Sequence, residues 1–222
     1  MRSFIRNLPA PVEFCIVVSL WFNPLILDGC FLLPKFIHSG VWEVDNAYLI
    51  RGAIFRLLAL AALIYIGNIR GWSLGKLGAE ISWRGAGCGL LLAGVSYLAS
   101  YGVWTIYELI IPPRHLNIIM TSLAIPVIIP TAIITSVFEE LVAAYFIQAL
   151  SRFGMWHAIL VSALLRTLYH VPWVGIEGLL GIFAVALIFA FVYWRWRQLW
   201  PLVLAHVLRN LYFLLFAVHH AA

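Results

Sequence analysis

The sequence predicts an all-α polytopic membrane protein, a bundle of about seven to eight transmembrane helices. Of the 222 residues, 64% are hydrophobic and only 10% are charged, whereas about a quarter of the residues in a soluble domain are charged. Apolar runs near the roughly 20 residues that a helix needs to cross the hydrocarbon core recur along the chain. These observations indicate a single transmembrane domain over residues 1–222.

Seven apolar segments have the length and hydropathy of membrane spans. They cover residues 13–33, 50–68, 85–111, 118–150, 156–172, 178–194 and 200–218. The fourth segment is too long for one straight crossing, and it contains Pro126 and Pro130. Because proline removes a backbone donor and clashes with the preceding turn, we expect a broken or re-entrant piece up to about Pro130, followed by a continuous helix. A further crossing there would raise the count to eight.

The connections between the spans carry most of the basic residues, which orient a membrane protein. Residues 69–84 mix apolar and charged side chains without reaching spanning length, so they predict an interfacial connector. With seven spans, the connections on the side of the N-terminus contain Arg2, Arg6, Arg70, Lys76, Arg84, Arg152, Arg195 and Arg197, and those on the other side contain Lys35, Arg51 and Arg114. This bias predicts a cytoplasmic N-terminus, and the compact chain is typical of a bacterial inner membrane protein.

The excess of positive charge does not indicate a nucleic-acid partner. The net charge is +5, but the basic residues are spread over many connections and form no stripe. Membrane lipids are the expected surroundings instead. Gly85 and Gly89 form one GxxxG motif, which indicates close helix packing.

Six polar or ionisable residues lie inside predicted spans, where such groups are costly and usually have a function. They are Glu139 and Glu140 in SVFEELVAAYF, Arg166 and His170 in LLRTLYH, and His206 and Asn210 in LAHVLRN. The last two pairs are each spaced by four residues, so both members of a pair share one helix face. The two glutamates are adjacent and diverge by about 100° around the helix, so only one can point squarely at a given site.

The depths of these residues in the membrane also agree. At about 1.5 Å per residue from the inner edges of the spans, Glu139, Arg166 and Asn210 lie at ~15 Å. His170 lies deeper and His206 shallower. Three helices are therefore predicted to bring polar groups to one level near the middle of the bilayer.

The order of these residues resembles the CPBP intramembrane proteases, also called the CAAX-protease or Abi family, which include the CAAX prenyl protease Rce1. The family pattern is EExxxR, then FxxxH, then HxxxN or HxxxD, each on a separate late span. Glu139 and Glu140 match the first motif, His170 the second, and His206 with Asn210 the third. The resemblance covers about residues 130–215 and implies a catalytic core over residues 130–218, with no counterpart for the first hundred residues.

Two positions depart from the family pattern. Ala144 stands where the first motif has its arginine, and Arg166 stands where the second motif has phenylalanine. We interpret the two departures as linked, with Arg166 supplying from the next span the cation that position 144 lacks. A buried glutamate pair needs a positive neighbour to remain charged, so Arg166 is expected within ion-pair distance of Glu140 or Glu139.

The residues predict peptide hydrolysis by an activated water. Glu139 is the candidate general base and would hold the water together with His170. His206 and Asn210, on one face of the last helix, would donate to the oxyanion. Glu140 is assigned a supporting role, balancing Arg166 or Arg209. The resemblance implies the same roles, and a substrate that is a peptide or the C-terminal segment of a membrane-associated protein.

Three alternatives use the same residues. Glu139, His170 and His206 would form the His₂Glu ligand set of a catalytic zinc site, although the chain has no HExxH motif and no cofactor is our first expectation. A proton-coupled transporter would use them as an ion relay, but the sequence has no inverted repeat of the kind common in such folds. A non-catalytic membrane binding protein is favoured by Ala144 alone.

Overall fold

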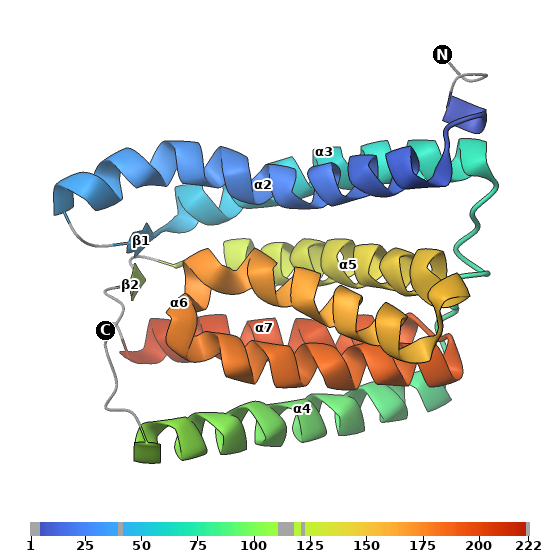
Figure 1. Ribbon diagram of the computed structural model, residues 1–222. Coiled ribbons are helices and arrows are strands. Elements are labelled where there is room, and N and C mark those ends of the chain that lie inside the picture. Colours follow the sequence, from blue (N-terminus) through green and yellow to red (C-terminus); the bar gives the residue numbers. More distant parts are fainter. Residues whose placement is uncertain (1–4, 40–41, 111–117, 121–122, 221–222) are drawn as a thin grey trace. The chain divides into compact units, whose positions relative to one another are not determined.

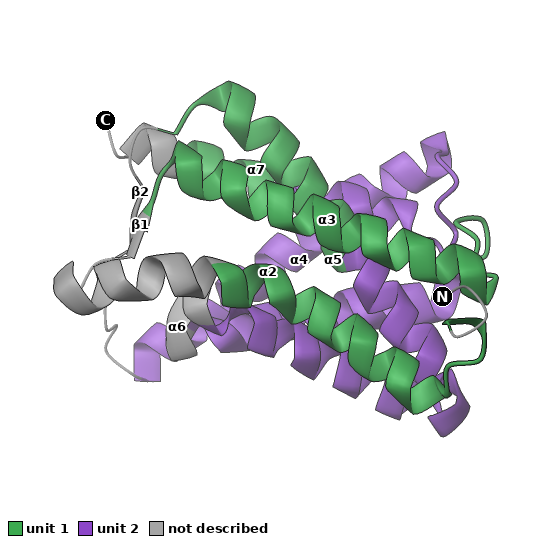
Figure 2. Ribbon diagram, turned by 90° about the horizontal axis from the view of Figure 1, so that it is seen from above, with its two compact units in different colours: residues 1–76, 117–139, 210–222 green, residues 77–116, 140–209 purple. Residues whose placement is uncertain are grey.

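The computed structural model describes residues 5–39, 42–110, 118–120 and 123–220, and it is almost entirely helical there (Figure 1). Its elements, in chain order, are α2 (Ala10–Ser39), β1 (Trp42–Val44), α3 (Asn46–Arg70), α4 (Trp83–Ile110), β2 (Ile118–Met120), α5 (Ile125–Leu150), η1 (Ser151–Phe153), α6 (Met155–Trp196) and α7 (Trp200–His220). The chain divides into two compact units, which Figure 2 shows in different colours. One comprises residues 1–76, 117–139 and 210–222, and the other residues 77–116 and 140–209.

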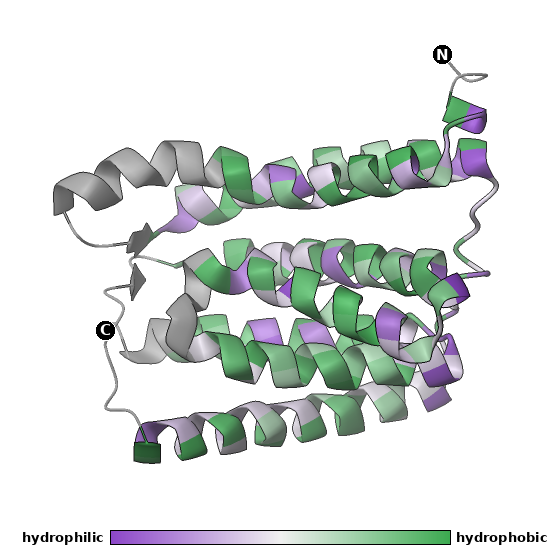
Figure 3. Cartoon of the chain, in the orientation of Figure 1, coloured by the Kyte–Doolittle hydropathy of each residue, from purple (hydrophilic) through white to green (hydrophobic). Residues whose placement is uncertain are grey.

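The helices have the length and composition of membrane spans. Five helical segments of the described residues are long and apolar enough to cross a membrane: Ala10–Leu27, Asn46–Arg70, Trp83–Ile110, Ile125–Phe153 and Gly178–Trp196. Figure 3 shows hydrophobic residues along these helices, and on α4 Leu91 and Leu98 are 73% and 68% exposed. Since large exposed apolar side chains suit lipid rather than water, the protein is an integral membrane protein. The count of seven to eight spans and the cytoplasmic N-terminus stay predictions, and Arg114 lies outside the described residues.

In the first unit, polar contacts fix the ends of α2 and α3. The side chain of Asp45 caps α3 by accepting from the backbone N–H of Tyr48 at 2.7 Å. At the other end, Arg70 Nη2 lies 2.6 Å from Glu13 Oε2, which joins the last turn of α3 to the first turn of α2.

The strands β1 and β2 pair in parallel, with Trp42 opposite Ile118 and Val44 opposite Met120. The prediction of a purely α-helical chain missed this pair, because strands of three residues leave no clear period in the sequence.

The start of α5 corrects the prediction of a broken piece before Pro130. The helix is continuous from Ile125, with Pro126 in its first turn and Pro130 inside it. The N–H groups of a first turn have no partner within the helix, so Pro126 costs no hydrogen bond. Pro130 removes one bond, the one to the carbonyl of residue 126, while the rest of the helix is intact. Residues 125–150 therefore form one helix and not two pieces.

In the second unit, α6 contains both of the spans predicted at residues 156–172 and 178–194. Figure 1 shows that its first and last parts run in opposite directions. The guanidinium carbon of Arg166 lies 5.1 Å from the ring centroid of Phe189, whereas 23 residues of straight helix would separate them by about 35 Å. The two parts of α6 therefore pack against each other as separate spans would.

A glycine allows the loop before α4 to reach the start of α7. Gly78 has a φ of 72°, and a Cβ at this position would clash with the carbonyl oxygen of Arg197. Its own carbonyl accepts from the backbone N–H of Leu199 at 2.8 Å. Only glycine fits both the backbone conformation and this close approach. The loop belongs to the connector predicted for residues 69–84, whose position at the membrane surface stays a prediction.

The GxxxG motif of α4 lies against the first turns of α7, as its sequence predicted. A Cβ added to Gly85 would meet the ring of Trp200 at 2.8 Å, and one added to Gly89 would meet the carbonyl oxygen of Pro201 at 2.9 Å. By contrast, a Cβ on Gly87 would meet nothing within 4 Å. The small residues therefore allow α4 and α7 to approach closely within this unit.

We expect Gly89→Ala to destabilise the protein by about 1–3 kcal/mol, because the added methyl group overpacks the contact with Pro201. Gly87→Ala is the matched control, and it is expected to be neutral or to stabilise the helix by up to about 1 kcal/mol. Thermal unfolding of both variants in the same detergent measures the difference. Equal melting temperatures would contradict the close packing of α4 on α7.

Candidate active site

The helix α5 supplies the glutamates from a position in the protein interior. Every residue from 138 to 147 is buried, and a helix buried on all sides belongs to the core of its bundle. Glu139 and Glu140 are only 2% and 1% exposed. Both carboxyl groups are therefore held away from water and from lipid, where an ionised group requires partners.

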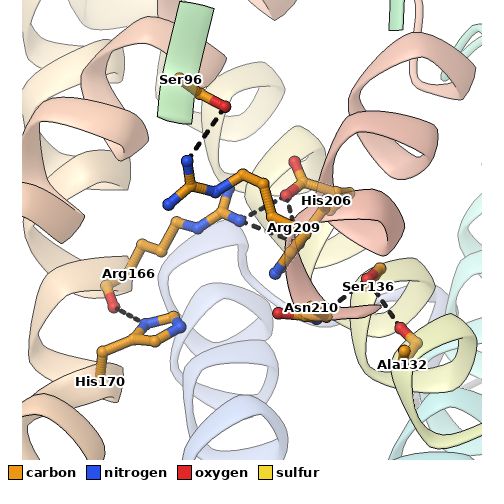
Figure 4. A network of polar contacts seen from close by, with 9 residues as sticks. Ser96, Ala132, Ser136, Arg166, His170, His206, Arg209 and Asn210 are labelled. Atoms are coloured by element: carbon orange, nitrogen blue, oxygen red, sulfur yellow. Dashed lines mark hydrogen bonds and ion pairs between the residues drawn. The ribbon is translucent and has the colours of Figure 1, made fainter. Parts of the chain in front are cut away.

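In the second unit, Glu140 accepts from two side chains on two other helices, Arg166 and His206, both of which are labelled in Figure 4. Its Oε1 lies 2.5 Å from Arg166 Nη2 and 2.8 Å from His206 Nδ1. Nη2 and Nδ1 are 3.0 Å apart, which follows because both donors converge on the same oxygen. These three residues form what we call the Glu140 cluster, and the predicted ion pair of Arg166 with Glu140 is present in it.

An aromatic ring completes the Glu140 cluster. Phe189 lies 5.1 Å from the Arg166 guanidinium, and its ring meets the imidazole of His206 edge-on at 6.4 Å between centroids. A guanidinium over an aromatic face is attracted by the ring and is weakly hydrated, so it tolerates this desolvated place. The ring restricts both partners of Glu140.

The alanine that replaces the family arginine lies beside this cluster. Ala144 is one helical turn after Glu140, and it lines a cavity of ≈ 10 Å³ together with Glu140, Arg166, Phe189 and Tyr193. This volume is about what one water molecule needs. An arginine at position 144 would not fit beside the side chain of Arg166. The contacts support the interpretation that Arg166 replaces the missing cation from another helix.

His170 is fixed by its own helix. Its Nδ1 lies 2.8 Å from the backbone carbonyl oxygen of Arg166, one turn earlier. A carbonyl accepts only, so Nδ1 carries a proton, and in the neutral imidazole Nε2 is then an acceptor. This tautomer suits the predicted role of His170 in holding a water. Arg166 thus contacts two site histidines, one through its side chain and one through its backbone.

Glu139 and Asn210 belong to the first unit. The side-chain amide of Asn210 donates to Ser136 Oγ at 3.1 Å, and Ser136 gives its own proton to the carbonyl oxygen of Ala132 at 2.7 Å. The hydroxyl therefore fixes which end of the amide is nitrogen. Since Glu139 and Asn210 lie in the other unit from His170 and His206, the prediction that these four residues share one cavity stays a prediction.

The sequence analysis missed the role of Ser136 and offered a partner for Arg209 that the structure does not show. Ser136 was not among the candidates, although it lies four residues before Glu140 and therefore on the same face of α5. Arg209 was an alternative partner for Glu140, but the structure places its guanidinium against Ser96 and Ser100 on α4.

Among the residues that the structure describes, no three His, Cys, Asp or Glu side chains are gathered to hold a metal ion.

The comparison with protein families agrees with the motifs. Residues 121–212 match a family model described as Rce1-like, type II CAAX prenyl endopeptidase Rce1-like. The resemblance that the sequence indicated for residues 130–215 is thereby confirmed. No curated protein and no solved structure matches the chain. The family supports a membrane protease in general, while the roles assigned to individual residues stay predictions.

The link between Ala144 and Arg166 can be tested by moving the cation back to α5. Ala144→Arg alone is expected to destabilise the protein, because it overpacks the cavity and places two cations beside one carboxylate. Arg166→Phe alone leaves the buried Glu140 without its ion-pair partner, which typically costs about 3–5 kcal/mol. The double variant is expected to be more stable than either single one, and thermal unfolding measures this. A double variant with the summed loss of the two single variants would contradict the link.

Proposed function

We propose that the protein is an intramembrane endopeptidase that hydrolyses a peptide bond near the C-terminus of a membrane-associated, prenylated protein, using a water activated by Glu139. The Glu140 cluster is the observation that supports this division of roles. Glu140 Oε1 already accepts from a guanidinium and an imidazole, so its charge is balanced and its lone pairs are occupied. A general base must instead accept a proton from water. Since Glu140 is held by these contacts, we assign the role of base to its neighbour Glu139.

The chemistry then follows from the remaining side chains. Glu139 takes a proton from the water while the water oxygen attacks the peptide carbonyl. His170 Nε2, an acceptor in the tautomer set by its backbone contact, helps to hold the water. When the C–N bond breaks, the proton from Glu139 passes to the leaving amine. The products are a carboxylic acid and an amine, which become a carboxylate and an ammonium group when the acid gives its proton to the amine, and Glu139 returns to its ionised form.

His206 and Asn210 are proposed to stabilise the oxyanion that forms during attack. Because Nδ1 of His206 is bound to Glu140, Nε2 is the nitrogen that we assign to the oxyanion. In the imidazolium form both nitrogens carry protons, so Nδ1 donates to Glu140 and Nε2 to the oxyanion. The amide of Asn210 is held as a donor by Ser136. Both groups are fixed before the reaction, which is the condition for effective stabilisation of developing charge.

Glu139→Gln is expected to abolish cleavage without unfolding the protein, because the amide keeps the shape of the side chain but cannot take a proton. The assay uses the full chain in lipid nanodiscs and a fluorescence-quenched peptide that ends in a prenylated cysteine and three further residues. Glu108→Gln, an exposed glutamate on α4, is the matched control and is expected to retain activity. Normal activity in Glu139→Gln would remove Glu139 as the base.

The zinc alternative is separated by chelators and by two further variants. Without a metal, phenanthroline and EDTA are expected to leave activity unchanged, and His206→Ala and Asn210→Ala each to lower the rate by about 10²–10³-fold, as for one oxyanion donor. Activity lost with chelators and restored by zinc, together with stoichiometric zinc in the purified protein, would assign Glu139, His170 and His206 as ligands instead. The absence of any turnover in the wild-type protein would favour a binding protein or a transporter.

A further inference from the structure

The second unit holds another cation, Arg209, which the proposed mechanism does not use. Its Nη1 donates to Ser96 Oγ at 3.3 Å, and its Nη1 and Nη2 both approach Ser100 Oγ, at 3.5 Å and 3.4 Å. The two hydroxyls give their own protons to the carbonyl oxygens of Ala93 and Tyr97, so both accept from the guanidinium. Within the described part of the chain, no carboxylate forms an ion pair with Arg209.

The positive charge of Arg209 is therefore not balanced by a carboxylate among the described residues of this unit. Glu140 is paired with Arg166, whereas the contacts of Arg209 are with the hydroxyls of Ser96 and Ser100. The serine hydroxyls supply dipoles but no negative charge. A guanidinium at membrane depth is costly unless it has a functional partner. An anion bound beside the guanidinium would balance this charge.

The geometry suits a carboxylate. Arginine presents five N–H donors in a planar fork that matches the two oxygens of a carboxylate. The long contacts to the serines orient the fork and leave donors for a ligand. Arg209 is only partly buried, so a ligand can reach it, and Figure 4 shows its side chain extending from α7 toward Ser96.

Arg209 lies close along α7 to His206, which the proposed mechanism uses. Arg209 lies three residues after His206, so the two side chains emerge from one side of the helix about 5–6 Å apart at their Cβ atoms. An extended peptide covers about 3.3–3.6 Å per residue. An anion bound at Arg209 is therefore within a few residues of an oxyanion held by His206.

We propose that Arg209, oriented by Ser96 and Ser100, binds the free C-terminal carboxylate of the peptide substrate. The inference rests on the proposed endopeptidase function and specifies which end of the substrate is recognised. A lipid phosphate offers similar chemistry to the guanidinium. The carboxylate is favoured because the cation lies next to the residues proposed to act on a peptide.

The test compares two prenylated peptides that differ only in a C-terminal acid or amide. In the wild-type protein, the acid is expected to be cleaved with a kcat/KM about 10- to 100-fold above that of the amide, the range for a charge-assisted hydrogen bond. Arg209→Gln is expected to bring this ratio near one, and Arg209→Lys to restore part of it. Arg152→Gln, which removes an exposed cation of the same unit, is the control and should keep the wild-type ratio.

A binding measurement separates this inference from the proposed function. In Glu139→Gln nanodiscs, the acid is expected to bind more tightly than the amide, and adding Arg209→Gln is expected to remove the difference, whether or not the wild-type protein cleaves either peptide. If Arg209→Gln is poorly folded, Ser96→Ala with Ser100→Ala replaces it and should also lower the acid-to-amide ratio. Equal binding of acid and amide to the Glu139→Gln protein would overturn the proposal. An effect of Arg209→Gln only when anionic lipid is present would assign the cation to a lipid phosphate instead.

Discussion

One carboxylate oxygen organises the second unit. Glu140 Oε1 receives Arg166 from the first part of α6 and His206 from α7, so a single atom joins three helical segments in the interior of the protein. Removing either donor leaves a buried charge with too few partners, which is far more costly than the pair itself is stabilising. The packing of the aromatic ring of Phe189 on both donors depends on the same atom.

The contacts of Glu140 distinguish it from its neighbour Glu139. Glu139 and Glu140 are adjacent on α5, but the helix directs them about 100° apart. The Glu140 carboxylate is bound by Arg166 and His206, and the proposed mechanism assigns the role of base to Glu139. Pairs of carboxyl groups whose surroundings differ in this way are a recurrent means of assigning acid and base roles.

The sequence predicted most of the membrane helices and singled out Glu140, Arg166 and His206 as site residues, because apolar length and polar residues at membrane depth are strong local signals. It did not predict that His206 binds Glu140. It also predicted the ion pair of Arg166 with Glu140, since the charge lost at position 144 had to be replaced. It did not predict the role of Ser136, the serine partners of Arg209 or the parallel strands. Those contacts depend on which helix faces and chain segments meet, and this is set by the three-dimensional register rather than by local composition. The predicted break at Pro130 was wrong because Pro126 lies in the first turn, where no bond is lost, and the helix continues past Pro130 with the loss of one bond.

The location of Arg166 on α6 also has a consequence for how the chain enters the membrane. The sequence of α5, IPVIIPTAIITSVFEELVAAYFIQAL, contains two glutamates and no lysine or arginine. With a cation at position 144, the charge of Glu140 would be balanced within α5 itself, because residues 140 and 144 are neighbours on one helix face. In this protein the neutralising charge arrives only with the next segment of the chain. We therefore expect α5 to be more stable in the membrane together with the first part of α6 than alone.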